Sequence, residues 1–307
     1  MAYRSEAQAR LSGGHFVDPQ VLARINNLEL VAKTVVEGFI TGLHRSPYMG
    51  FSIDFAEHRA YMPGDDIRGI DWRLFARTDK YFVKKFEADT NTDFMVLFDV
   101  SASMGYTTGG LTKFDYGRFL AASLTYFSRH QRDRVGLVTF DHDIVEYVPP
   151  SAKHLEVVLH HLERAEPMGT GEFRKPMRKI AGLLRRKGLV VVISDFYEDP
   201  EQVVNSITEL KFHGNDVVTF HLLDPAELTL PFNKSVHFED MESGEQIPVV
   251  PTRIREQYTG KLNDHIDVIS KKLRAHQIDY TLLDTSMPLD FALFQYLSER
   301  QRIGRVR

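Results

Sequence analysis

Short apolar runs alternate with helical patterns across the second two thirds of the chain. A run such as FMVLF at 94–98 is rich in residues that favour strands. Runs of this kind occur at 94–98, 135–140, 189–194, 217–222 and 279–283. Segments with helical spacing follow them or lie between them, at 112–130, 151–164, 173–186, 199–212, 253–276 and 289–301. This alternation predicts an α/β fold with a doubly wound, mostly parallel sheet and helices on both of its faces.

Two parts of the chain depart from the alternation. Residues 229–250 contain two short strand-like runs, KSVHFED and EQIPVV, separated by a turn sequence that ends at Gly244, and they predict an inserted antiparallel hairpin. Residues 1–90 begin differently, since Asp18 and Pro19 start a helix predicted to reach about Gly38. Strand-like alternation follows at 50–62 and 81–87. We therefore predict a helical and β-rich elaboration over 1–90, packed on a main domain over 91–307.

The composition excludes several classes of protein. Hydrophobic residues make up 43% of the 307 residues and charged residues 26%, which is typical of a globular chain with a real core. The net charge of -4 gives no field that would attract nucleic acid, and we expect no nucleic-acid partner. The absence of cysteine excludes thiolate catalysis, cysteine-ligated zinc, iron–sulfur clusters and disulfides.

Neither an export signal nor a membrane span is expected from the sequence. The first twenty residues carry charges and glycines where a signal peptide needs an apolar stretch. The longest apolar runs, such as 94–100 and 188–194, stop far short of the ~20 residues that cross a bilayer. We therefore expect a soluble, cytoplasmic protein.

Oxygen-bearing side chains follow the first of the predicted strands. Asp99, Ser101 and Ser103 occupy alternate positions of a short loop directly after FMVLF. Carboxylate and hydroxyl oxygens are the ligands that a hard cation such as Mg²⁺ prefers. Thr170 lies between two glycines before a predicted helix, and Asp195 follows the run GLVVVIS. Because parallel strands end at one edge of the sheet, these pieces are expected to converge.

The five side chains predict a site for Mg²⁺, with Mn²⁺ and Ca²⁺ as alternative ions. We expect Ser101, Ser103 and Thr170 to bind the ion directly, and Asp99 and Asp195 to bind it through water. A mostly neutral set of direct ligands leaves the ion strongly electrophilic, so that it attracts an incoming carboxylate. The predicted partner is a protein that presents an Asp or Glu side chain to the ion.

Several segments also resemble known families. The string DVSAS at 99–103, with the separate Thr170 and Asp195, resembles the metal-ion-dependent adhesion site of von Willebrand factor A domains. The segment HRSPYMGFSIDFAEHRAYMPGDDIRGIDWRLFARTDKYFVKKFEAD at 44–89 resembles the bacterial family named domain of unknown function 58, DUF58, as do LLDPAELTLPF, the hairpin and LDFALFQYLSERQR. The resemblance implies a von Willebrand factor A-like domain and a partnership with a MoxR-type AAA+ ATPase in chaperone-like or metal-insertion assemblies.

The predicted function is that of a metal-dependent protein–protein interaction module, acting as an adaptor or co-chaperone of such an ATPase, and not that of an enzyme. The chain has neither GxxxxGK[ST] nor a GxGxxG after a strand, so it should not itself hydrolyse ATP or hold NAD. Two alternatives stay open. One is a Mg²⁺-dependent phosphoester hydrolase, for which Asp115, Asp141 and His142 are the nearest candidate bases, and the other is a metal-free scaffold with its partner surface elsewhere, as on 44–89.

Overall fold

The computed structural model describes residues 18–25, 27–45, 58–60, 75, 80–84 and 92–296. The chain divides into two compact units, and the described residues of 18–39 belong to the same unit as those of 92–296. We call these two stretches together the sheet unit. The other unit contains the described residues of 40–84. The predicted boundary between residues 90 and 91 stays a prediction, because 85–91 lie outside the described residues.

The sheet unit is built on a six-stranded sheet with the order β10-β7-β6-β3-β4-β5. All neighbouring strands pair in parallel except β4 and β5, which are antiparallel. The predicted α/β fold with a mostly parallel sheet is therefore confirmed, and β5 is a strand that the sequence analysis did not predict. The strands are β3 (Asp93–Asp99), β4 (Arg134–Phe140), β5 (Ile144–Ser151), β6 (Gly188–Ser194), β7 (Asp216–Leu223) and β10 (Asp279–Asp284).

The central strand β3 shows why its sequence is apolar without interruption. Successive side chains of a strand point to opposite faces of the sheet, and here both faces are covered. Met95 and Leu97 join the core cluster formed with α7, α8 and α10. Phe98 points to the other face, where its ring lies 5.2 Å from the ring of Phe114 in α5. Burial on both faces therefore accounts for the run FMVLF.

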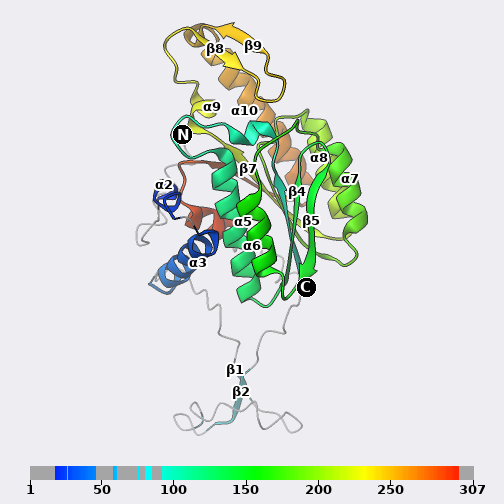
Figure 1. Cartoon of the computed structure of the whole chain (residues 1–307). Helices are drawn as coiled ribbons and strands as arrows, with labels where there is room; N and C mark the ends of the chain where they lie inside the picture. The colour runs from blue at the N-terminus through cyan, green and yellow to red at the C-terminus, as the bar shows by residue number, and fades with distance from the viewer. Residues whose placement is uncertain are drawn as a thin grey trace. The chain divides into compact units, whose positions relative to one another are not determined.

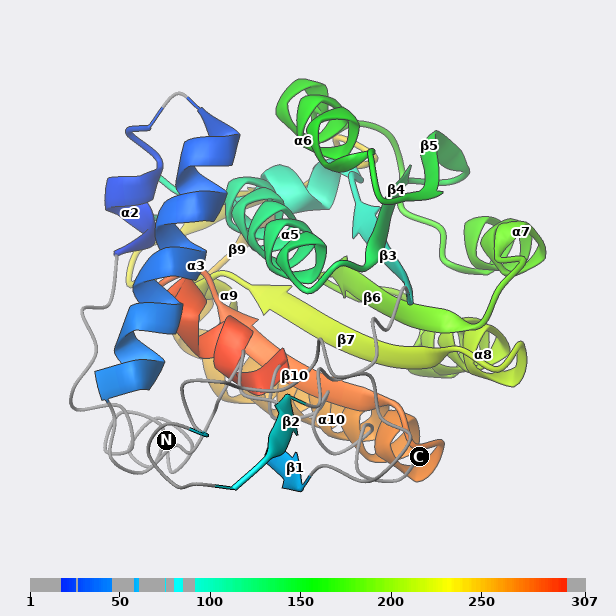
Figure 2. The same cartoon turned by 90° about the horizontal axis from the view of Figure 1, so that it is seen from below.

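Helices cover both faces of the sheet, as Figure 2 shows: α5 and α6 lie on one face, and α7, α8 and α10 on the other. Each of the five corresponds to a predicted helical segment, and residues 289–296 are helical as well. None of the described helices combines the length and the apolar character that crossing a bilayer requires. The helices are α5 (Lys113–His130), α6 (Leu155–Arg164), α7 (Arg174–Leu183), α8 (Pro200–Phe212) and α10 (Pro251–Ala275).

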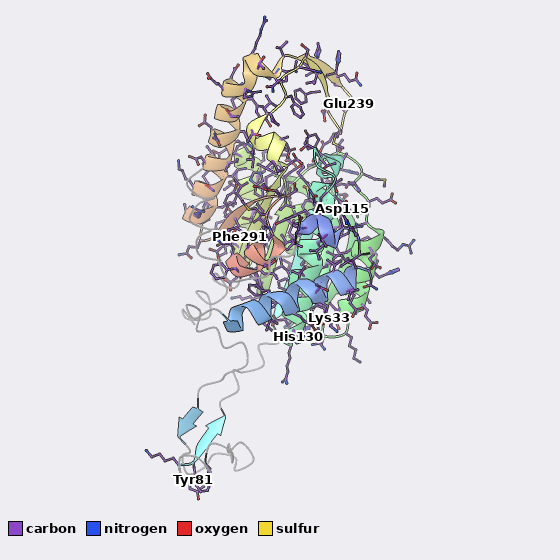
Figure 3. The ribbon with its side chains drawn as sticks, turned by 90° about the vertical axis from the view of Figure 1, so that its left-hand side faces the viewer. Lys33, Tyr81, Asp115, His130, Glu239 and Phe291 are labelled. Atoms are coloured by element: carbon purple, nitrogen blue, oxygen red, sulfur yellow. The ribbon has the colours of Figure 1, made fainter. Side chains whose placement is uncertain are left out.

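The inserted hairpin is also confirmed. Its strands, β8 (Val236–Glu239) and β9 (Gln246–Val249), form a separate antiparallel pair after the short helix α9 (Pro225–Thr229). Figure 1 shows the hairpin at one end of the sheet unit, near the start of α10. In Figure 3, Asp115 at the start of α5 lies toward hairpin residue Glu239, and His130 lies at the opposite end of that helix. The hairpin and the start of α5 are thus at the same end of the sheet unit.

The single helix predicted from Asp18 to about Gly38 is wrong, because the structure has two helices, α2 (Pro19–Leu22) and α3 (Leu28–Arg45). Asp18 caps α2 by accepting a hydrogen bond from Gln20 N. Asn27 Oδ1 then accepts one from Leu30 N, 2.7 Å away, which provides a new capped start for α3. A second capping side chain therefore divides the segment.

The other unit contains the strands β1 (His58–Ala60) and β2 (Phe82–Lys84), which pair antiparallel. Both lie within segments that the sequence predicts to be strand-like, 50–62 and 81–87. The rest of those two segments lies outside the described residues, apart from residue 81 beside β2.

Candidate metal site

The carboxyl ends of β3 and β6 form the floor of a pocket of about 280 Å³. Four of the five predicted metal ligands line this pocket, namely Asp99, Ser101, Ser103 and Asp195. The parallel pairing of Phe98 with Ile193 brings the ends of the two strands side by side, so that the following residues share one edge of the sheet. The expected convergence of the strand ends is therefore observed.

Asp99 is fixed by hydrogen bonds at both of its carboxylate oxygens. Its Oδ1 accepts from Ser101 N at 2.9 Å, and its Oδ2 accepts from Ser194 Oγ at 2.5 Å. Ser194 Oγ in turn accepts from Phe196 N at 3.0 Å. Ser194 is not among the ligands predicted from the sequence, although it directly precedes Asp195. The signal available was the hydroxyl at the carboxyl end of a buried strand.

Two carboxylates are buried close together in this pocket. Asp99 is 4% exposed and Asp195 3% exposed. Burial, and next the charge of Asp195, raise the pKa of Asp99 to about 7 against the hydrogen bonds from Ser194 and Ser101. A cation in the pocket would stabilise both ionised groups.

The two serine hydroxyls have the spacing of neighbouring ligands of one ion. Ser101 Oγ and Ser103 Oγ are 3.1 Å apart. In an octahedral Mg²⁺ site with ligand distances of about 2.1 Å, adjacent ligands are about 3.0 Å apart. The described residues contain no group of three or more His, Cys, Asp or Glu side chains that could hold a metal ion, so a metal site here would depend on the hydroxyls.

The carboxylate of Glu198 adds an observation that the sequence analysis did not anticipate. Glu198 lines the same pocket, and its Oε1 is buried without a hydrogen-bond partner among the described residues. A buried carboxylate oxygen without a partner is costly unless a positive group or water contacts it. The donor set of hydroxyls and carboxylates and this orphaned oxygen both fit a bound Mg²⁺.

Thr170 is the predicted ligand that the structure does not bring into the pocket. Its side chain is exposed and is not among the residues that line the pocket. The loop itself is close, because Ala102 N donates to Gly169 O at 3.1 Å. Gly169 has φ of +78°, and the loop presents Gly171 to the pocket. The role of Thr170 as a direct ligand stays a prediction.

Lys113 was missed by the sequence analysis, and it contacts one of the predicted ligands. Its Nζ lies 2.8 Å from Asp195 Oδ2 and 2.8 Å from Glu227 Oε1 in α9, and its side chain is 1% exposed. Burial disfavours the ammonium, but these two carboxylates outweigh burial and raise the pKa of Lys113. The sequence does contain a signal for this contact, because Lys113 is the first residue of a helix. A positive charge there opposes the helix dipole unless a carboxylate compensates it.

The hairpin also contributes to the pocket. Asp240 and Glu242, from the turn between β8 and β9, line it, and Glu242 Oε1 accepts a hydrogen bond from Gly171 N at 3.0 Å. The sequence predicts the hairpin but not its position over the site. No local pattern could have indicated this contact, because it joins residues 71 positions apart in the chain.

The bases considered for a hydrolase lie outside the pocket. Asp115 accepts hydrogen bonds from Thr112 Oγ1 and Arg118 at the start of α5. Asp141 Oδ1 lies 3.0 Å from His142 Nδ1. None of Asp115, Asp141 and His142 belongs to the pocket lining as the described residues form it. The structure therefore places none of these three candidate bases at the pocket.

Comparisons with solved structures give matches of low overall similarity. A conserved hypothetical protein, BatB from Bacteroides thetaiotaomicron, has a TM-score of 0.48 at 15% identity, over 70% of this chain and 99% of that one. An aerotolerance-related membrane protein from Bacteroides fragilis has a TM-score of 0.47 at 16% identity, with the same coverage. The VWA domain of SpRpn10 has a TM-score of 0.39 at 15% identity, over 66% of this chain and 93% of that one.

Comparison at the level of sequence covers most of the chain. The uncharacterized protein Rv1480 of Mycobacterium tuberculosis is 29% identical over 238 residues, which is 75% of this chain and 74% of that protein. The uncharacterized protein Mb1516 of Mycobacterium bovis matches with the same values. The model of the family described as protein of unknown function DUF58 matches residues 57–267. Since this match covers more than half of the residues, the chain belongs to the DUF58 family.

Proposed function

We propose that this protein is a metal-dependent interaction module that binds an Asp or Glu side chain of a partner protein through a Mg²⁺ ion. The observation that carries the proposal is the pair of serine hydroxyls, Ser101 and Ser103, 3.1 Å apart in a pocket with two buried carboxylates. These are the ligand types and the ligand spacing that Mg²⁺ requires.

Each residue of the site has a proposed role. Ser101 and Ser103 hold the ion directly, while Asp99 and Asp195 orient bound water. Thr170 is a further direct ligand in this proposal only if its loop turns the exposed side chain into the pocket. Hydrogen bonds from Ser101 N and Ser194 Oγ fix the Asp99 carboxylate, so that it is ordered before the ion arrives. When bound, the ion supplies a positive charge with an open coordination position for the partner's carboxylate.

The rim of the pocket suits a protein partner. Tyr197 lines the pocket and is 43% exposed, and Met241, beside Glu242 in the hairpin turn, is 45% exposed. Protein interfaces are enriched in exposed aromatic residues and methionine around a few polar contacts. The resemblance described from the sequence supports a MoxR-type AAA+ ATPase as the partner, with this protein as its adaptor or co-chaperone.

We propose no catalytic role for the site. The bases that the sequence suggested for phosphoester hydrolysis do not line the pocket. Asp115 is engaged by Thr112 and Arg118, and Asp141 contacts His142, outside the pocket lining as the described residues form it.

Calorimetric titration of Mn²⁺ or Mg²⁺ into the purified protein tests the proposal. We expect Ser101→Ala to weaken metal binding about tenfold or more, since it removes a direct ligand. The matched control is Ser270→Ala in α10, whose hydroxyl bonds Asp267 O away from the pocket, and it should bind the ion like the wild type. Equal affinities of the wild type and Ser101→Ala would contradict the proposal.

The partnership is tested separately, by capture of the purified MoxR-type ATPase from the same organism in Mg²⁺ and in EDTA. We expect capture in Mg²⁺ by the wild type and by Ser270→Ala. Capture should be lost in EDTA and in Ser101→Ala. Metal-independent capture would contradict the role of the ion in partner binding.

A further inference from the structure

The hairpin places a carboxylate of this same chain at the candidate metal site. We propose that Glu242 is an internal ligand of the site, which a partner's carboxylate must displace in order to bind. This inference rests on the proposed function, because it requires that an ion be held by the loop of Asp99, Ser101 and Ser103. It adds a regulatory element, since the unpartnered protein would be closed by its own carboxylate.

The first support is the position of Glu242. Its Oε1 accepts from Gly171 N at 3.0 Å, in the loop that follows Thr170. A Cβ atom built on Gly171 would lie 3.2 Å from this oxygen and 3.7 Å from Ser101 Oγ. The Glu242 carboxylate and a hydroxyl proposed to bind the ion therefore both lie within 4 Å of the same point beside Gly171.

The second support is the charge of the pocket. Of the described residues that line it, five are acidic and none is Lys, Arg or His. The nearby ammonium of Lys113 is already paired with Asp195 and Glu227. A further carboxylate directed toward such a pocket is repelled unless a cation lies between the groups. The five acidic residues are Asp99, Asp195, Glu198, Asp240 and Glu242.

The third support is the order of the turn that carries Glu242. Asp240 Oδ1 accepts from Glu242 N at 2.9 Å, and Asp240 Oδ2 accepts from Ser243 Oγ at 2.7 Å. Gly244, with φ of +73°, donates its N–H to Asp240 O at 2.7 Å. These bonds hold the backbone of the turn, and therefore the point from which the Glu242 side chain extends toward Gly171.

The turn is also anchored on the loops of the site. A Cβ atom built on Gly105 would lie 3.4 Å from Met241 Cε and 3.4 Å from Pro167 Cγ. Met241 therefore packs at the end of the loop that carries Ser101 and Ser103. An internal ligand anchored in this way has an effective concentration on the order of millimolar, so a weak external carboxylate competes poorly with it.

Water-proton relaxation with bound Mn²⁺ tests the inference, with Mn²⁺ alone as the first probe. An internal carboxylate occupies a position on the ion that water would otherwise take. We expect Glu242→Ala to raise the relaxation enhancement per bound Mn²⁺ and to weaken Mn²⁺ binding about tenfold. The matched control is Glu245→Ala, which removes an exposed carboxylate from the same turn and should behave like the wild type.

A second variant tests the position of Glu242 without removing its charge. In Gly171→Ala the new methyl group would lie 3.2 Å from Glu242 Oε1, so this oxygen would have to shift by a few tenths of an ångström. We expect the same direction of change as in Glu242→Ala. Acetate, added as an external carboxylate, should lower the relaxation enhancement at several-fold lower concentration in Glu242→Ala than in the wild type.

The outcomes separate the two proposals. Equal relaxation enhancement and equal acetate competition in the wild type and Glu242→Ala, with Mn²⁺ bound to both, would overturn the internal ligand and leave the metal site intact. If the wild type binds no Mn²⁺, both the internal ligand and the proposed function are overturned. Glu242 is exposed, so its removal should leave the fold intact.

Discussion

Asp99 ends β3 and Asp195 directly follows the neighbouring strand β6. The two are almost equally buried, but their charges are compensated in different ways. Asp195 contacts the buried ammonium of Lys113 at 2.8 Å. Asp99 accepts its hydrogen bonds from neutral groups, the amide of Ser101 and the hydroxyl of Ser194. One side of the pocket therefore carries its own cation, while the other side holds a fixed carboxylate that the proposed function pairs with a cation from solution.

The largest effect should come from removing the internal cation. Lys113→Met leaves the Asp195 and Glu227 carboxylates buried without their partner, which we expect to lower the free energy of unfolding by about 3–5 kcal/mol. Urea denaturation measures the change. The control is Lys271→Met, which breaks an exposed pair with Asp267 and should cost about 0.5 kcal/mol or less. If Lys113→Met and Lys271→Met lowered the free energy of unfolding equally, Lys113 would not be the special cation that distinguishes Asp195 from Asp99.

The second effect separates the aspartates directly, in the absence of metal. Asp195→Asn removes a charge-assisted hydrogen bond from Lys113, and we expect it to cost about 1.5–3 kcal/mol. Asp99→Asn keeps an oxygen for Ser101 N and removes a buried charge, so its unfolding free energy should change by about 1 kcal/mol or less. Urea denaturation of both variants in EDTA is the measurement. A larger loss in Asp99→Asn would reverse the comparison.

The smallest effect concerns a buried carboxyl away from the site. Burial raises the pKa of Asp290 to about 6, and its Oδ1 has no hydrogen-bond partner among the described residues. The folded protein therefore holds this proton more tightly than the unfolded chain does. The resulting stabilisation is complete below the ordinary pKa of 3.8 and is lost as the pH rises through about 6.

Asp290→Asn cannot ionise, so it should gain about 1 kcal/mol over the wild type at pH 8 and nothing at pH 4. This figure is reduced because the side chain is partly exposed. Thermal denaturation at the two pH values measures the difference. Asp290 thus provides a reference for a carboxyl that has no cation partner among the described residues. A gain that does not depend on pH would argue against this use.

The strands differ in how well their sequences predict them, and burial explains the difference. β3 and β6 are buried on both faces and have continuous apolar runs, FMVLF and LVVVI, which are strong signals. β5 is an edge strand with partly exposed positions, and it contains Pro149 and Pro150. Prolines are tolerated at an edge but weaken any sequence-based strand prediction.

The residues of the candidate site also differ in how well the sequence predicts them, because some are close together in the chain and others are far apart. Asp99, Ser101 and Ser103 lie within five residues, so one loop determines their convergence. Lys113 and Asp195 are 82 residues apart, and no local pattern pairs them. At Thr170 the sequence identifies the loop, but it does not determine that Gly171 and not the threonine side chain lines the pocket.

Glu227 connects the ion pairs of Lys113 with the segment that leads into the hairpin. It belongs to α9, whose first turn is closed by a capping box with Asp224. In the chain, α9 is followed by the hairpin that carries Glu242. A chimera that exchanges hairpins with a relative should therefore be joined after Thr229. Joining it before Asp224 would also exchange Glu227, the second carboxylate that holds Lys113. The surroundings of Asp195 in the recipient's pocket would then change together with the hairpin.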